Sequence, residues 1–127
     1  MIELGRRLAA RAKPGLIIRL IGPLGVGKTT LARGFIRGLG FEGDVRSPTF
    51  NLIFEYSTQP PVCHADLFRL SGPREIADLG LEEYFETHAV LIEWAEKAGD
   101  LLPEDAATIE LSFADVGREA RLEGLET

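Results

Sequence analysis

The spacing of apolar residues in the first third of the chain predicts a helix, a buried strand and a second helix. Apolar side chains at residues 4, 8 and 9, with arginines between them, indicate a short amphipathic helix that ends at Pro14-Gly15. Residues 16–21 are mostly apolar and β-branched, and glycines bound them, as is typical of a strand inside a mainly parallel sheet. Residues 28–39 repeat apolar side chains at every fourth position and are followed by Gly40, which predicts the second helix.

The rest of the chain predicts strands with short helical pieces between them. Residues 50–56 and 62–66 flank Pro60-Pro61 and form a predicted hairpin. Residues 89–92 are another buried run, which leads directly into Glu93. The remaining predicted elements are helical pieces at 73–79 and 81–86 and a closing pair of strands at 107–113 and 118–123. We therefore expect an α/β fold with a mostly parallel sheet and antiparallel flanking strands.

Length and composition are those of one folded domain. The 127 residues fall below the roughly 150 that serve as a one-domain prior, so we expect a single domain over residues 1–127. A lone cysteine, Cys63, excludes a disulfide scaffold and a structural zinc site. No apolar run approaches the about 18 residues of a membrane span, and the first residues lack the apolar core of an export signal. We expect a cytoplasmic protein with no membrane attachment.

Charge is distributed unevenly along the chain. The formal net charge is −6, which argues against nucleic-acid binding through bulk electrostatics. Residues 1–46 carry nine basic and three acidic side chains, a balance of +6, whereas residues 47–127 carry five basic and seventeen acidic side chains, a balance of −12. The first segment should therefore favour an anionic ligand, although solvated helix faces alone would also explain the asymmetry.

A phosphate-binding loop lies between the predicted strand at 16–21 and the predicted helix that follows it. The sequence Gly22-Pro23-Leu24-Gly25-Val26-Gly27-Lys28-Thr29 matches the pattern G-x-x-x-x-G-K-[ST] in the context that this pattern requires. Glycines let backbone N–H groups converge on an anion, the helix dipole adds positive potential, and Lys28 can neutralise the β- and γ-phosphates. Thr29 supplies a hydroxyl for Mg²⁺, and Thr30 can reach the α-phosphate. The predicted nucleotide-binding residues of this segment are Gly22, Gly25, Val26, Gly27, Lys28, Thr29 and Thr30.

Two carboxylates follow buried strands and are candidates for the catalytic chemistry. In parallel sheets, sites lie beyond the carboxyl ends of the strands, where Glu93 and Asp66 are expected. We assign Glu93 as a direct or water-mediated Mg²⁺ ligand and Asp66 as a water-orienting acid. The two roles could be exchanged, because the sequence alone does not say which strand lies nearer to the loop.

Three other polar residues near these segments each allow a functional and a structural interpretation. Thr49, in Arg46-Ser47-Pro48-Thr49, could sense the γ-phosphate as part of a switch segment, or could belong to an ordinary polar loop. His64 is more typical of a packed or hydrogen-bonded core histidine than of a general base. Arg69 could stabilise phosphoryl charge or form a salt bridge to a nearby carboxylate.

Together these segments resemble the TsaE family, the small P-loop ATPases of bacterial tRNA threonylcarbamoyladenosine biosynthesis. The resemblance extends over nearly the whole chain. The loop itself is generic, but the later motifs in this order are specific to the family. The segments that carry the resemblance are Gly22 to Leu31, Ser47-Pro48-Thr49-Phe50, His64-Ala65-Asp66-Leu67-Phe68-Arg69-Leu70, Leu79-Gly80-Leu81-Glu82-Glu83-Tyr84 and Leu91-Ile92-Glu93-Trp94-Ala95-Glu96.

The resemblance implies a fold, an activity and partners. The expected fold is a P-loop NTPase-like three-layer sandwich, and the expected cofactors are ATP and Mg²⁺. The expected activity is an ATPase that acts with the TsaB and TsaD proteins, which place the threonylcarbamoyl group on adenosine 37 of tRNAs reading codons that begin with A. Hydrolysis would support turnover of that assembly, and tRNA would be met only through it.

The resemblance also implies roles for particular residues. Glu93 would join Thr29 as the second protein ligand of the metal, and Asp66 and Thr49 would lie near the γ-phosphate. Trp94 would lie close to the nucleotide, and Arg118 matches a nucleotide-contacting position. Family members usually carry a strand before the first helix, so base contacts from the N-terminus are expected to be missing or rearranged in this chain. The family's usual proline after the Trp94 position is Ala95 here, which should leave the acid in place.

Other classes of nucleotide-binding protein are less compatible with the sequence. Guanine recognition in small GTPases generally uses Asn-Lys-x-Asp, but the only asparagine is Asn51, followed by Leu52. A small-molecule kinase needs an acceptor pocket and a lid, for which 127 residues leave little chain. A protein that holds ATP without hydrolysing it stays open, because no committed general base is visible.

Overall fold

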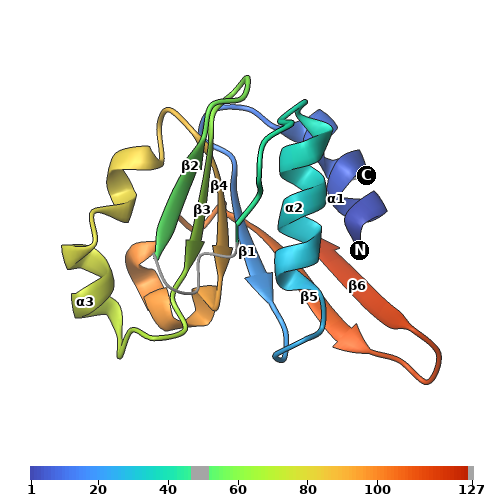
Figure 1. Ribbon diagram of the computed structural model, residues 1–127. Helices are drawn as coiled ribbons and strands as arrows, with labels where there is room; N and C mark the ends of the chain where they lie inside the picture. The colour runs from blue at the N-terminus through green and yellow to red at the C-terminus, as the bar shows by residue number, and fades with distance from the viewer. Residues whose placement is uncertain (47–51, 126–127) are drawn as a thin grey trace.

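A six-stranded sheet forms the centre of the computed structural model, which describes residues 1–46 and 52–125 (Figure 1). In chain order the strands are β1 (Ile17–Ile21), β2 (Ile53–Tyr56), β3 (Val62–Asp66), β4 (Ala89–Glu93), β5 (Ala107–Phe113) and β6 (Arg118–Glu123). Across the sheet their order is β2-β3-β4-β1-β5-β6. Strands β3, β4, β1 and β5 run parallel, whereas β2 and β6 pair antiparallel with β3 and β5. The predicted parallel centre with antiparallel flanking strands is confirmed.

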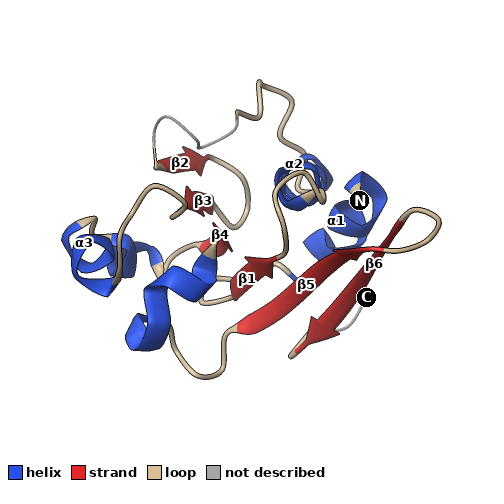
Figure 2. Cartoon of the chain, turned by 90° about the horizontal axis from the view of Figure 1, so that it is seen from below, coloured by secondary structure: helices blue, strands red, loops and turns tan. Residues whose placement is uncertain are grey.

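Helices cover both faces of this sheet (Figure 2). On one face lie α1 (Ile2–Leu8), a 3₁₀ helix (Ala9–Arg11) and α2 (Lys28–Gly38); on the other lie α3 (Pro73–Asp78) and 3₁₀ helices at Leu81–Tyr84 and Ala95–Leu101. With helices on each face of the sheet, the expected three-layer sandwich is confirmed. Within the described residues, no helix has the length and apolar character that crossing a membrane would require.

Alternating side chains of the central strands fill two separate cores. Ile18 and Leu91 belong to the core that includes α1 and α2, whereas Ile17 and Val90 belong to the core that includes α3. Because successive side chains of a strand point to opposite faces of the sheet, a strand buried on both faces is apolar at most of its positions. This is why the apolar runs at 16–21 and 89–92 identify strands of the sheet centre.

Most predicted boundaries agree with the structure, and one element was not predicted. Both closing strands have the predicted ends. The strand predicted at 50–56 is Ile53–Tyr56 in the structure, and residues 50 and 51 lie outside the described residues. The helical turns at Ala95–Leu101 were missed because Gly99, with φ at 55°, interrupts them and leaves pieces too short for a clear helical period.

Close packing of α1 against α2 fixes the helix that follows the glycine loop. A Cβ atom at Gly34 would lie 2.1 Å from the backbone oxygen of Ile2, and a Cβ at Gly5 would lie 2.1 Å from that of Leu31. Only glycine permits this approach, because protein interiors leave no space for an added methyl group. The close contact with α1 thus fixes the position of α2, whose first residue is Lys28.

Candidate functional site

The glycine loop connects the end of β1 to the start of α2 at the carboxyl edge of the parallel strands. Gly22, Gly25 and Gly27 have φ angles of 152°, 80° and 117°, which side chains with a Cβ rarely adopt. A Cβ at Gly22 would also lie 2.6 Å from the backbone oxygen of Leu111. Val26 is fully buried and packs in the core beneath the loop, so its side chain anchors the loop to the fold. The loop therefore has the backbone freedom that an anion-binding nest requires.

Lys28 is enclosed at the base of this loop. Its side chain is buried, its Nζ donates a hydrogen bond to the Gly22 oxygen, and the same atom lies 3.7 Å from the centre of the Trp94 ring. Burial lowers the pKa of Lys28, while the negative charges of Glu93, Glu96 and Asp66 act in the opposite direction. The ammonium group is thus placed inside the site rather than in solvent.

Thr29 and Glu93 face each other across the gap between α2 and β4. The Thr29 hydroxyl lies 2.9 Å from Oε1 and 3.0 Å from Oε2 of Glu93, and its single proton is donated to this carboxylate. Glu93 is only 3% exposed. A hydroxyl and a carboxylate in contact are oxygen ligands of the kind that Mg²⁺ binds together with phosphate oxygens and water. The pair therefore fits a divalent cation.

Asp66 ends the strand next to that of Glu93. The two residues are register partners of the parallel pair β3 and β4. The Asp66 carboxylate accepts a 2.9 Å hydrogen bond from the backbone N–H of Phe68. Burial raises the pKa of Asp66, and the negative charge of Glu93 adds to this effect. The two acids meet at one edge of the sheet, as their sequence positions predicted.

A cavity of about 270 Å³ brings most of the predicted residues together. Its wall includes the rings of Phe68 and Trp94, whose centres are 4.9 Å apart and whose planes are tilted by 48°. Trp94 has φ at 59°, an uncommon backbone conformation for a residue with a side chain. The lining residues are Leu24, Gly25, Gly27, Lys28, Thr29, Thr30, Asp66, Phe68, Glu93 and Trp94.

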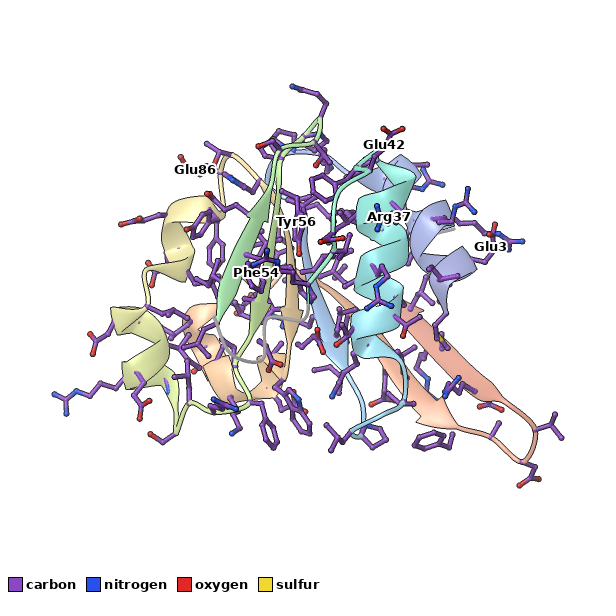
Figure 3. The ribbon with its side chains drawn as sticks, in the orientation of Figure 1. Glu3, Arg37, Glu42, Phe54, Tyr56 and Glu86 are labelled. Atoms are coloured by element: carbon purple, nitrogen blue, oxygen red, sulfur yellow. The ribbon has the colours of Figure 1, made fainter. Side chains whose placement is uncertain are left out.

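Among the described residues, three predicted site residues do not line this cavity, namely Gly22 and Val26 of the loop and Arg118. Arg118 begins the edge strand β6, is exposed, and lies with its guanidinium 5.9 Å from the Phe113 ring. Thr49 lies outside the described residues. The segment that precedes it is held by Tyr56, whose hydroxyl accepts a 3.0 Å hydrogen bond from the backbone N–H of Arg46 (Figure 3). Tyr56 also packs edge-on against Phe41.

His64 is the buried, hydrogen-bonded core histidine that the sequence favoured, but its contact with Glu93 was not predicted. Its Nε2 lies 2.7 Å from Glu93 Oε2, and the side chain is fully buried. The available signal was its spacing, because His64 and Asp66 are two positions apart and therefore share one face of β3. A histidine on the face that carries a candidate acid deserved more weight than a histidine on an isolated apolar strand.

Larger hollows elsewhere on the molecule lack this chemistry. A groove of about 1080 Å³ runs along residues 10–17 and is bordered by Asp105 and the end of β6. Another hollow lies beside α1 and α2, where Glu3 and Arg37 are labelled in Figure 3. Neither contains the glycine loop or the pair of acids.

No group of three or more His, Cys, Asp and Glu side chains suited to a metal ion occurs in residues 1–46 and 52–125. A structural zinc site or an all-protein cation cage would need such a group. Mg²⁺ in a nucleotide site needs fewer protein ligands, because substrate phosphates and water complete its octahedron. The donor set of Thr29 and Glu93 fits the nucleotide type of site.

Replacing Asp66 by asparagine is expected to raise the melting temperature near pH 7. Because burial raises the pKa of Asp66, the folded state favours the protonated acid, and its charged form costs stability above that pKa. The asparagine oxygen can still accept the hydrogen bond from Phe68. The gain should shrink as the pH falls through the raised pKa toward the ordinary value of 3.8. Calorimetry of both proteins across this range tests the prediction, and a variant that melts below the parent near pH 7 would contradict it.

Comparisons with known proteins agree with this arrangement. The family model "Threonylcarbamoyl adenosine biosynthesis protein TsaE" matches residues 1–121. The tRNA threonylcarbamoyladenosine biosynthesis protein TsaE of Haemophilus influenzae is 36% identical over 129 residues, covering 96% of this chain and 82% of that protein. The Bacillus subtilis protein of the same name is 44% identical over 108 residues, covering 84% and 67%. The crystal structure of Bacillus subtilis YdiB has a TM-score of 0.78 and 36% identity, covering 94% of this chain and 74% of that chain.

Proposed function

This chain belongs to the TsaE family of threonylcarbamoyl adenosine biosynthesis proteins, and we propose that it is a Mg²⁺-dependent ATPase whose site is the cavity between the glycine loop, β3 and β4. The observation that carries the proposal is the convergence of three groups. The buried ammonium of Lys28, the hydroxyl of Thr29 and the carboxylate of Glu93 line one cavity of about 270 Å³. Cation, hydroxyl and acid are the side-chain groups that binding of a nucleoside triphosphate with its metal requires.

The loop and Lys28 would bind the phosphates of ATP. Backbone N–H groups of a glycine-rich loop at a helix N-terminus attract anions, and Lys28 adds a full positive charge at the same place. In the structure, Lys28 Nζ donates to the Gly22 oxygen and lies over the Trp94 ring. A phosphate would offer this ammonium group a stronger acceptor than a backbone carbonyl, because the acceptor is charged.

Thr29 and Glu93 would hold Mg²⁺, and Asp66 would orient the attacking water. When bound, the metal ion neutralises negative charge on the phosphates and fixes their geometry. The contact of the Thr29 hydroxyl with Glu93 supports Glu93 as the metal ligand. Asp66 is its neighbour on the next strand and has an oxygen that can accept a hydrogen bond from water.

ATP hydrolysis would serve tRNA modification through an assembly with the TsaB and TsaD proteins. Family membership supports the pathway, and the partners follow from the family resemblance. The net charge of −6 supports an indirect contact with tRNA, since an acidic protein gains little from counterion release on RNA. We therefore propose that the assembly, rather than the isolated chain, binds tRNA.

The test is phosphate release from Mg-ATP by the purified chain, alone and with its TsaB and TsaD proteins. The proposal predicts release that the partners stimulate and that disappears when a chelator removes Mg²⁺. The same stimulation should be absent in the Lys28→Ala variant. No hydrolysis under either condition, with ATP still bound, would instead indicate a nucleotide-binding protein without turnover.

A further inference from the structure

The buried carboxylate of Glu93 has a second partner besides Thr29. His64 lies on β3, one strand away from Glu93, and its Nε2 is 2.7 Å from Glu93 Oε2. The two side chains are 0% and 4% exposed. Water therefore does not compete for this contact, which strengthens a hydrogen bond and makes its loss costly.

The environment of the imidazole ring identifies the donor. Carboxylate oxygens only accept hydrogen bonds, so Nε2 of His64 carries the proton that is donated to Glu93. Nδ1 of His64 is the buried side-chain nitrogen or oxygen without a hydrogen-bond partner in the described part of the chain. The contact with Glu93 is therefore the hydrogen bond that holds the ring in the described structure.

Two donors on different sides restrain the Glu93 carboxylate. The terminal torsion of a glutamate side chain has broad minima, so packing alone orients its carboxylate weakly. Thr29 approaches from α2, and His64 approaches from β3. Of these two, Thr29 is itself a proposed ligand of the metal ion, whereas His64 lies outside the lining of the cavity. His64 is therefore the donor that can orient Glu93 without taking part in binding.

We propose that His64 is a positioning residue that sets the affinity of the site for a divalent cation by holding the Glu93 carboxylate in its binding orientation. The inference rests on the proposed Mg-nucleotide function and deepens it. Groups that orient a metal ligand typically change metal affinity by about 10- to 100-fold. A purely structural histidine would change the stability of the fold and leave the affinity of the folded protein for the cation unaltered.

Three substitutions at His64 separate orientation from packing. Glutamine places its amide nitrogen as many bonds from the backbone as Nε2 of histidine, so His64→Gln keeps the donor to Glu93. Asparagine places its amide nitrogen at the distance of Nδ1, so His64→Asn keeps polarity but loses this contact. His64→Leu removes the donor and keeps volume. Cys63→Ala is the matched control, because Cys63 is equally buried on the same strand but packs in the other core.

The measurement is equilibrium binding of Mn²⁺ to each variant in the presence of ADP, by electron paramagnetic resonance of the free ion. We expect His64→Leu and His64→Asn to bind Mn²⁺ about 10- to 100-fold more weakly than the parent. His64→Gln should restore the parent affinity, and Cys63→Ala should keep it. Thermal unfolding of every variant shows whether the folded fraction accounts for any loss. Should His64→Leu not fold, the glutamine and asparagine pair decides the question.

The outcomes of the Mn²⁺ binding experiment distinguish failure of the His64 role from failure of the proposed function. Parent-like Mn²⁺ affinity in His64→Asn and His64→Leu would overturn the inference, as would equal losses in the glutamine and asparagine variants. If the parent protein itself binds no Mn²⁺ with ADP, the proposed function fails rather than the role of His64. A loss in Cys63→Ala as large as that in His64→Leu would show that packing of β3, not the hydrogen bond, sets the affinity.

Discussion

Replacing Glu93 by alanine is expected to abolish Mg²⁺-dependent ATP hydrolysis while some nucleotide binding remains. The Glu93 carboxylate is in contact with the Thr29 hydroxyl, and the substitution removes it. The turnover number should fall by more than about 100-fold, because that is the largest typical effect of residues that only orient a ligand. Phosphate release gives the turnover number, and calorimetric titration with ATP in the presence of a chelator gives the metal-independent affinity.

Two controls keep the Glu93 result specific. Glu93→Ala leaves the fully buried His64 donor unpaired, which costs about 1–3 kcal/mol, so folding must be verified by circular dichroism. Glu96→Ala removes an exposed carboxylate whose negative charge raises the pKa of Lys28 but which does not line the cavity. That variant should hydrolyse ATP like the parent. Unchanged turnover in folded Glu93→Ala would remove its metal role and favour Asp66 in its place.

Replacing Lys28 by alanine is expected to weaken Mg-ATP binding by about 10- to 150-fold, the equivalent of a charged hydrogen bond worth about 1.5–3 kcal/mol. Because burial lowers the pKa of Lys28, its charge costs free energy in the folded protein. The variant should therefore fold as well as the parent while its affinity for Mg-ATP falls. Calorimetric titration with Mg-ATP measures this loss directly.

Lys13→Ala is the matched control for Lys28→Ala. Lys13 is exposed and lines the large groove along residues 10–17 rather than the nucleotide cavity. Its removal changes the net charge by the same amount, so it measures the general electrostatic effect on an anionic ligand. A Lys28→Ala variant that binds Mg-ATP as tightly as Lys13→Ala would show that the glycine loop is only a structural turn.

The sequence predicted the position of each acid but not which acid meets Thr29. The order of strands in the sheet decides this: β4 lies beside β1, so Glu93 ends next to the glycine loop, whereas Asp66 on β3 ends one strand further away. Strand order depends on long-range packing that a local pattern does not encode. The structure shows that Glu93 is the acid in contact with Thr29, and the division of metal-binding and water-orienting roles between Glu93 and Asp66 stays a prediction.

The other site features were predictable only where the local sequence determines them directly. The glycine loop was recognised because backbone conformation at Gly25 and Gly27 imposes glycine directly. His64 and Glu93 are 29 residues apart, and their contact depends on the register of β3 and β4. The spacing of residues within one segment does not predict that register. Arg118 was assigned by resemblance alone, and it lies on the edge strand outside the cavity lining. Its role in nucleotide binding stays a prediction.

A crystal structure of the chain with Mn²⁺ and a non-hydrolysable ATP analogue tests the central claim most directly. The anomalous signal of Mn²⁺ locates the metal independently of the protein phases. We predict one peak at about 2.1 Å, the usual distance for a small divalent cation, from the Thr29 hydroxyl, with Glu93 as a direct or water-bridged ligand and the analogue's phosphates along the glycine loop. A peak or nucleotide elsewhere, such as in the large groove along residues 10–17, would contradict the account.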